Sequence, residues 1–241
     1  MTALTVDAHE NTQIRAVIFD MDGCLVDSEP LSLEAVAAEM RHAGLLDATA
    51  SEVGAKYLGV SLPKIIQDVE ERLGAPCHTD FIDRMENHLF KAYSSGLRQI
   101  DGVEDLLVAL DSAGIAVAIA SGASVRRLDR TLEYSGLDRF FPKHRFSADL
   151  VPRGKPAPDV FLLAAETLGL PPRNCAVLED SPHGIKGAVE AGMRAVGFVG
   201  GSHLAGREAS HAAVLRQAGA VETIQHLSKA FAALVGTRST P

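Results

Sequence analysis

The chain has 241 residues, of which 46% are hydrophobic, and its net charge is −8. It is long enough to bury a substantial core, and its acidic balance argues against a nucleic-acid partner, which needs a basic face. A single phosphorylated metabolite remains possible, because one metal ion and one lysine can outweigh the global charge. No apolar run is long enough to cross a membrane, and the polar start of the chain lacks the features of a secretory signal. We expect a cytoplasmic monomer without membrane partners and with a disordered lead over residues 1–13.

The first informative segment joins a short apolar run to two acidic residues. Val17, Ile18 and Phe19 predict a strand buried on both faces. Asp20 and Asp22 follow at its carboxyl end, where ligands bind in open α/β sheets. Because two carboxylates this close repel each other unless a cation lies between them, the segment predicts a magnesium site. The simpler interpretation is a strand followed by an Asp-Gly turn.

Residues 29–98 predict an all-helical insert. Apolar residues recur at helical spacing in three stripes, without the alternation of strands, and Ser28 and Glu29 stand where a helix cap is expected. We expect a small helical bundle whose stripes form its core. The stripes are Leu31, Leu33, Val36, Ala37 and Met40, then Ile65, Ile66, Val69 and Leu73, then Phe81, Met85, Leu89 and Phe90.

From Gly102 onward, predicted helices and strands alternate. The helices are expected over 103–110, 125–134, 159–168 and 184–191, and the strands over 115–120, 175–178 and 195–199. This rhythm predicts βαβ units and a parallel sheet, so that 14–28 and 99–235 together form an α/β core. Right-handed crossovers place the carboxyl ends of all strands at one edge. Residues that end different strands should therefore meet in one crevice.

Three polar clusters stand at such strand ends or in loops beside them. Ser121 and Gly122 precede a helix and could cradle a phosphate, although serine is also a common helix cap. Lys155 lies between glycine and proline in a rigid loop that suits a point-charge contact to a phosphoryl oxygen, or else an ordinary surface turn. Glu179 and Asp180 end another apolar strand and could complete an oxygen-only magnesium shell.

The three cysteines, Cys24, Cys77 and Cys175, are widely spaced and odd in number, which indicates reduced thiols. Cys24 lies beside the acidic pair. Because no histidine is near it in sequence and its neighbours are apolar, we interpret it as a packing residue and not as a nucleophile.

Taken together and in this order, the motifs resemble those of the haloacid dehalogenase superfamily of phosphohydrolases. The resemblance extends over nearly the whole chain, and the helical insert after the first motif is similar to the cap of a subgroup that contains sugar-phosphate phosphatases and β-phosphoglucomutase. The motifs that carry it are Asp20-Met-Asp22-Gly-Cys-Leu-Val-Asp27-Ser28, Ser121-Gly122-Ala123-Ser124, Gly154-Lys155-Pro156 and Leu178-Glu179-Asp180-Ser181.

The resemblance implies a Rossmann-like core with an inserted helical cap, and a Mg²⁺-dependent phosphatase acting on a small phosphorylated metabolite, a sugar phosphate or sugar-acid phosphate. Asp20 would be the nucleophile that forms an aspartyl-phosphate, and Asp22 the general acid and base. Magnesium would be held by Asp20, the main-chain carbonyl of Asp22 and Asp180, with Glu179 as a further ligand or as the holder of a bound water. The equatorial phosphoryl oxygens would be stabilised by Ser121, the amide of Gly122 and Lys155.

A β-phosphoglucomutase-like mutase is the first alternative. The mutase that this chain resembles carries a histidine, a lysine and an arginine at positions that hold Ser32, Leu58 and Leu62 here. Because a mutase must hold a second phosphate, the missing cations favour a phosphatase. Cap residues 57–62 are expected to select the substrate, with 28–31 and 97–102 as hinges. A non-catalytic binding protein on the same fold is the second alternative, which turnover of any aryl phosphate would exclude.

Overall fold

The computed structural model describes residues 13–57 and 62–236. The expected disordered lead over 1–13 lies outside the described residues except for Gln13, whose carbonyl accepts a hydrogen bond from the side chain of Asn174. Residues 58–61, in the centre of the segment expected to select the substrate, also lie outside them.

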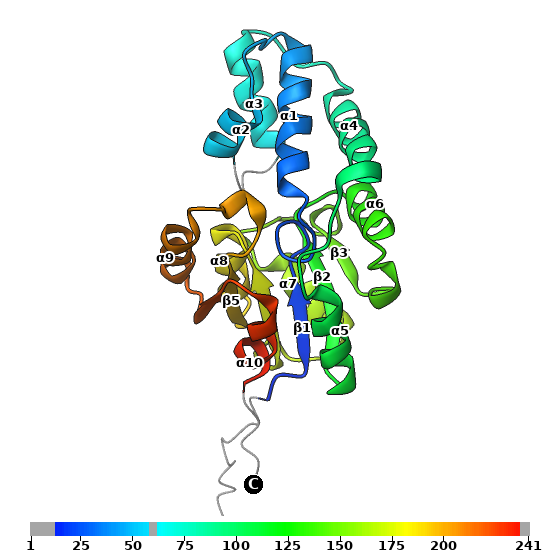
Figure 1. Ribbon diagram of the computed structural model, residues 1–241, viewed down its shortest axis with the longest axis vertical. Helices are drawn as coiled ribbons and strands as arrows, with labels where there is room; N and C mark the ends of the chain where they lie inside the picture. The colour runs from blue at the N-terminus through cyan, green and yellow to red at the C-terminus, as the bar shows by residue number, and fades with distance from the viewer. Residues whose placement is uncertain (1–12, 58–61, 237–241) are drawn as a thin grey trace, which may run out of the picture.

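A six-stranded, all-parallel sheet forms the centre of the molecule (Figure 1). Its strands run in the order β3-β2-β1-β4-β5-β6. This confirms the predicted α/β class, and β1 is buried along its whole length as expected for a strand covered on both faces. The strands are β1 (Ala16–Phe19), β2 (Ala116–Ser121), β3 (Arg145–Ser147), β4 (Cys175–Glu179), β5 (Arg194–Phe198) and β6 (Glu222–Ile224).

Helices cover both faces of the sheet, and alternate side chains of each strand pack against opposite layers. Val17 and Phe19 belong to a core shared with helices α5, α6 and α10, whereas Ala16 and Ile18 belong to a core shared with α7, α8 and α9. The helices are α5 (Val103–Ser112), α6 (Val125–Ser135), α7 (Asp159–Thr167), α8 (Pro182–Glu190), α9 (Glu208–Ala218) and α10 (Ala230–Val235).

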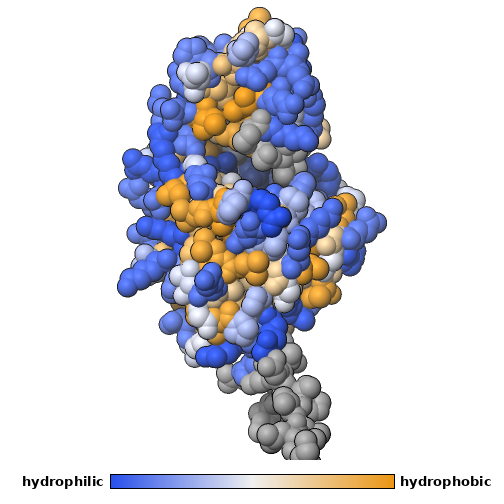
Figure 2. All heavy atoms as spheres, turned by 180° about the vertical axis from the view of Figure 1, so that it is seen from behind, coloured by the Kyte–Doolittle hydropathy of each residue, from blue (hydrophilic) through white to orange (hydrophobic). Residues whose placement is uncertain are grey.

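Four further helices form a separate layer above the carboxyl ends of the strands, and we call them the cap (Figure 1). They have a hydrophobic core of their own, in which the three predicted apolar stripes take part, including Met40, Val69 and Leu89. Seen from behind, hydrophobic side chains gather on the cap above the level where it meets the sheet layer (Figure 2). The cap helices are α1 (Glu29–Ala43), α2 (Ala50–Tyr57), α3 (Leu62–Leu73) and α4 (Phe81–Gly96).

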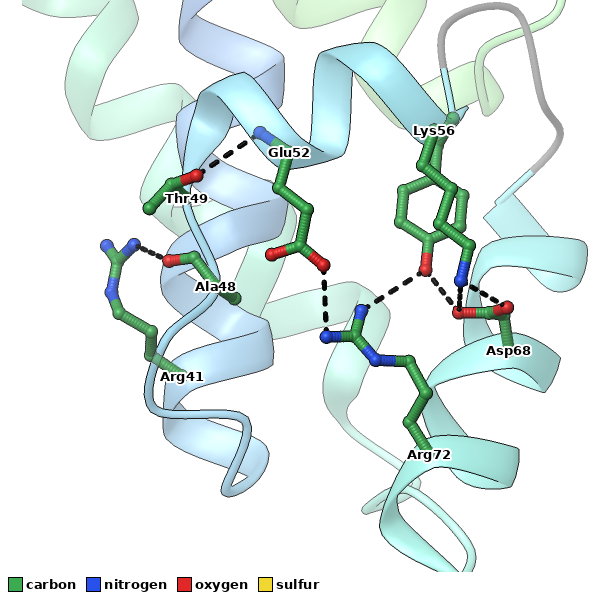
Figure 3. Close-up of polar contacts among 8 residues, drawn as sticks. Arg41, Ala48, Thr49, Glu52, Lys56, Asp68 and Arg72 are labelled. Carbon is green, nitrogen blue, oxygen red and sulfur yellow. Dashed lines mark hydrogen bonds and ion pairs between the residues drawn. The ribbon is translucent and has the colours of Figure 1, made fainter.

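A polar network ties α2 to α3 on either side of the undescribed 58–61 segment (Figure 3). Asp68 accepts hydrogen bonds from Lys56 at 2.7 Å and from the hydroxyl of Tyr57. Arg72 reaches the Tyr57 hydroxyl at 3.5 Å and pairs with Glu52 at 3.0 Å. Lys56, which stands beside this segment in the sequence, is therefore paired within the cap. Across the described residues, no helix is long and apolar enough to span a bilayer.

Candidate active site

The carboxyl edge of the sheet brings together acidic and basic residues from three distant parts of the chain. Asp20 follows β1, Glu179 ends β4, and Lys155 comes from the loop before α7. The Lys155 Nζ donates to Asp20 Oδ1 and to Glu179 Oε2, each at 2.6 Å. All three side chains are at least nine-tenths buried. Lys155 therefore bridges two buried carboxylates, which excludes the surface-turn interpretation. Its contact to a phosphoryl oxygen stays a prediction.

Electrostatics at this edge favour an additional cation. Burial, together with the neighbouring Glu179, raises the pKa of Asp20 well above its ordinary value, although Lys155 opposes the shift. Burial and Glu179 likewise raise the pKa of Asp180. Ionised Asp20, Glu179 and Asp180 carry three negative charges against one lysine, so the carboxylates lack full compensation by the protein.

Two histidines contact Asp180, one at its carboxylate and one at its main-chain carbonyl. His203 Nε2 lies 3.2 Å from Asp180 Oδ2, and His211 Nε2 donates to the main-chain carbonyl of Asp180 at 2.6 Å. Burial lowers the pKa of His203, which favours the neutral ring. Neither histidine belongs to a motif in the sequence: His203 lies in the short turn Ser202–Leu204 after β5, and His211 lies on the helix α9.

Gly23 makes room for Asp180. Its φ is +79°, and a Cβ at this position would lie 2.1 Å from Asp180 Oδ2. A side chain here would therefore displace the carboxylate and strain the backbone as well.

We expect Gly23→Ala to lower kcat/KM about 10-fold to 100-fold and to raise the Mg²⁺ concentration needed for half-maximal activity. The reason is that the Asp180 carboxylate must move by about an ångström or more to make room for the methyl group. Gly114→Ala is the matched control: its φ is +70° but nothing lies within 4 Å of its Cβ, so it carries the backbone strain alone. Steady-state assays over a Mg²⁺ titration would compare the two. Equal losses in both variants would contradict a specific role for the space at Gly23.

The side chain of Asp22 turns toward a different group of residues. It accepts hydrogen bonds from the Ser28 hydroxyl and from Arg127 Nη2, the latter at 3.0 Å. Ser28 stands at the N-cap position of α1 as expected, but its side chain caps no backbone amide and binds Asp22 instead. Arg127, on α6, is a site residue that the sequence reading did not single out. Its position in the first turn of α6, directly after the Ser121–Ser124 motif, was the one feature of the sequence that could have indicated it.

Ser121 lies at the end of β2 and is almost fully buried, and its hydroxyl accepts from the amide of Ala123 at 3.0 Å. The N-cap of α6 is Ser124, whose Oγ accepts from the amide of Arg127, so Ser121 is not the helix cap. Gly122 is exposed beside it and lines the same cavity. Ser121 and Gly122 thus belong to a small turn that lines the cavity.

Ser124 and Arg126 also join α6 to cap helix α4, and we call this contact the α4–α6 seam. The Ser124 hydroxyl donates to Glu86 Oε1 at 2.6 Å. Arg126 reaches Glu86 Oε2 at 3.2 Å and Asn87 Oδ1 at 2.7 Å. Its guanidinium also lies 5.1 Å from the centre of the Phe90 ring. The seam directly follows the turn formed by Ser121 and Gly122.

A cavity of about 590 Å³ lies between the cap and the sheet edge. The sheet side supplies most of its charged groups, including Asp20, Lys155 and Asp180. The cap supplies a largely apolar wall, with two acidic residues, Glu29 and Glu86. Its apolar lining residues are Leu33, Val36, Val53, Leu62, Ile65, Ile82 and Met85. The cavity is large enough for a small metabolite.

The donor atoms near Asp20 fit Mg²⁺. Ligand atoms of Asp20, Cys24 and Asp180 lie within 4.8 Å of one another. Magnesium takes oxygen ligands, which the two carboxylates offer. Burial and Asp180 raise the pKa of the Cys24 thiol, so it stays protonated and serves as a wall of the site, in line with its interpretation as a packing residue.

Comparison with known proteins places this geometry in a family. The model of the haloacid dehalogenase-like hydrolase family matches residues 14–192. The phosphorylated carbohydrates phosphatase of Thermotoga maritima is 31% identical over 193 residues, which cover 76% of this chain and 84% of that protein. A solved hydrolase of this family from Deinococcus radiodurans, with bound phosphate and sodium, is 30% identical with a TM-score of 0.71 and covers 92% of this chain and 96% of its own.

One relative is much longer than this chain. The chloroplast protein SUPPRESSOR OF QUENCHING 1 of Arabidopsis thaliana is 33% identical over 207 residues, which cover 80% of this chain but 19% of that protein. The chain belongs to the haloacid dehalogenase-like hydrolase family. The expectation that it is an enzyme, a hydrolase of this superfamily, is thereby confirmed.

Proposed function

We propose that the chain is a Mg²⁺-dependent phosphatase that hydrolyses a small phosphorylated metabolite, a sugar phosphate or sugar-acid phosphate, through an aspartyl-phosphate. The observation that carries the proposal is the cluster of Asp20, Lys155, Glu179 and Asp180 at one edge of the sheet. Residues 14–28 and 99–235 form the catalytic core in this proposal, and the cap over 29–98 selects the substrate.

In the first step, a carboxylate oxygen of Asp20 attacks the phosphorus and the ester bond to the leaving group breaks. Asp22 gives its proton to the departing alkoxide, for which its side chain must turn away from Ser28 and Arg127. Lys155, Ser121 and the amide of Gly122 stabilise the negative equatorial oxygens of the transferring phosphoryl group. In the second step, Asp22 takes a proton from water, which attacks the phosphorus and frees Asp20.

Asp20, the main-chain carbonyl of Asp22 and Asp180 would hold Mg²⁺, and Glu179 would join them directly or through a bound water. Glu179 also positions Lys155, because its Oε2 accepts from Nζ while its Oε1 accepts from the amide of Ser181. When bound, the ion offsets the charge between the nucleophile and the phosphate.

We expect the stability of the metal-free protein to fall as the pH rises. The pKa values of Asp20 and Asp180 are raised in the folded state, so folding is favoured by protonation. This contribution is fully present below the ordinary carboxyl pKa and is lost as the pH rises through the raised values. Thermal melts in EDTA between about pH 4.5 and 8 would show the decline. Excess Mg²⁺ should flatten it, and Asp180→Asn should reduce its slope; identical slopes in all three conditions would refute the expectation.

The proposed function is tested by phosphate release from a panel of sugar phosphates and sugar-acid phosphates, with Mg²⁺ and with EDTA. Mg²⁺-dependent release from one or a few compounds is the expected result. β-Glucose 1-phosphate is included to separate the mutase alternative, since conversion to glucose 6-phosphate with little free phosphate would replace the proposal. Of the three positions where a mutase would need cations, Ser32 and Leu62 line the cavity without charge, and Leu58 lies outside the described residues. Folded protein that turns over nothing would support the binding-protein alternative.

A further inference from the structure

Arg127 is a positively charged residue of the cavity to which the proposed catalytic steps assign no role. Among the described residues that line the cavity, Arg127 and Lys155 are the only lysine or arginine side chains. Lys155 is held between Asp20 and Glu179, whereas Arg127 contacts Asp22, the residue proposed to protonate the leaving group. Its side chain is 15% exposed.

The hydrogen bonds of Arg127 are incomplete. Nη2 donates to a single oxygen of Asp22, and the buried Nε has no partner. Nε and Nη2 form one edge of the planar guanidinium, and such an edge matches the two oxygens of a carboxylate. Tyr93 and Glu29 are the other groups that face Arg127. The Nε–Nη2 edge therefore has the geometry of a two-point carboxylate site in which Asp22 Oδ1 binds Nη2 and the buried Nε has no partner.

Asp22 must leave this position to act. Once its side chain turns toward the leaving group, Nη2 loses this partner while Nε already has none, which is costly for a guanidinium whose side chain is only 15% exposed. A substrate that brings its own carboxylate would take the place of Asp22 and release it for catalysis.

We infer that Arg127 is a specificity residue that binds a carboxylate on the leaving group, so that the enzyme prefers phosphate esters of sugar acids to those of neutral sugars. The inference rests on the proposed phosphatase function and narrows its substrate class. A second phosphate is a poorer fit than a carboxylate, because one guanidinium would face a dianion in a cavity that already holds Glu29, Glu86 and Asp149.

Matched substrate pairs test the inference. 6-Phosphogluconate and sorbitol 6-phosphate differ by a carboxylate in place of a hydroxymethyl group, and 3-phosphoglycerate and glycerol 3-phosphate form a shorter pair. The measured quantity is the ratio of kcat/KM for the acid to that for its neutral partner. Any effect of Arg127 on Asp22 acts on both members of a pair and cancels in the ratio. p-Nitrophenyl phosphate reports the catalytic machinery alone, and fructose 1,6-bisphosphate tests a second phosphate.

For the wild type, we expect a ratio well above one in at least one pair, and slow turnover of the bisphosphate. Arg127→Met should lower that ratio about 10-fold to 100-fold, and Arg127→Lys should restore part of it. Arg130→Met is the matched control, since Arg130 lies on the same helix, is half exposed and pairs with Glu133, so its ratio should equal that of the wild type.

A ratio at or below one in both pairs, with p-nitrophenyl phosphate turned over, would overturn the inference and leave the phosphatase intact. So would a ratio unchanged in folded Arg127→Met, or a bisphosphate preferred to both acids. If Arg127→Met does not fold, the wild-type ratios decide. Absence of turnover with every compound, p-nitrophenyl phosphate included, would instead count against the proposed function itself.

Discussion

Asp20→Asn should reduce Mg²⁺-dependent phosphatase activity by at least about 10⁴-fold, because an amide cannot form the aspartyl-phosphate. The same change should leave the protein folded. In EDTA its free energy of unfolding should rise by on the order of 1 kcal/mol, since a neutral group replaces a carboxylate whose pKa burial and Glu179 raise. The amide oxygen can still accept from Lys155. Kinetic assays and urea denaturation would measure the two effects on one preparation.

Asp27→Asn is the matched control for this prediction. Asp27 belongs to the same motif, but its carboxylate accepts from Ser202 and lies 3.6 Å from Arg98, away from Asp20. It should retain most of the activity. More than trace activity in pure Asp20→Asn would remove Asp20 from the role of nucleophile.

Lys155→Met should affect both activity and stability. Removing the ammonium group leaves Asp20 and Glu179 buried without their shared partner, which typically costs about 3–5 kcal/mol when one member of a buried pair is lost. The loss should be larger at pH 8 than at pH 5.5, because burial raises the pKa of Asp20 and its carboxylate can take up a proton at the lower pH. Activity should fall about 100-fold to 1,000-fold, the usual effect of losing one donor to a transferring group.

Denaturation in EDTA at the two pH values and assays at saturating Mg²⁺ would check these values. Lys143→Met serves as the control, since Lys143 is exposed in the loop before β3. A Lys155→Met protein as stable as this control at pH 8 would show that the bridge contributes nothing to folding.

The sequence was sufficient for strands β1, β2, β4 and β5 and for the edge at which they end. The run Val17 to Phe19 predicted a strand buried on both faces, and the structure has it so. Since parallel strands end at one edge, Asp20 and Glu179 could be expected to meet without any knowledge of distances. For Lys155 the glycine and proline of its loop left an ordinary surface turn open, and only the combination of the motifs placed it in the site. The catalytic roles of these residues remain predictions.

Two features of the molecule could not be predicted from the sequence: the short strands β3 and β6, and the place of Arg127 in the cavity. Strands β3 and β6 have three residues each, which is too short for alternation to be recognised. Arg126 and Arg127 are adjacent in the sequence, but a helix separates neighbours by about 100°, so one faces the cap and the other faces Asp22. Which arginine enters the cavity depends on how α6 is rotated, and this is a property of the packing.

The α4–α6 seam directly follows the turn formed by Ser121 and Gly122, which we propose binds the phosphoryl group. Ser121 and Gly122 line the cavity. A few residues further on, Ser124 donates a hydrogen bond to Glu86 of the cap and Arg126 donates one to Asn87. If the turn binds the phosphoryl group as proposed, phosphate binding and cap docking depend on one short stretch of backbone. The two equilibria are then linked reciprocally. If docking of the cap raises the affinity for phosphate by some factor, bound phosphate raises the equilibrium constant for cap docking by the same factor. If the docked cap binds phosphate more tightly, free inorganic phosphate should therefore slow amide hydrogen exchange in α4.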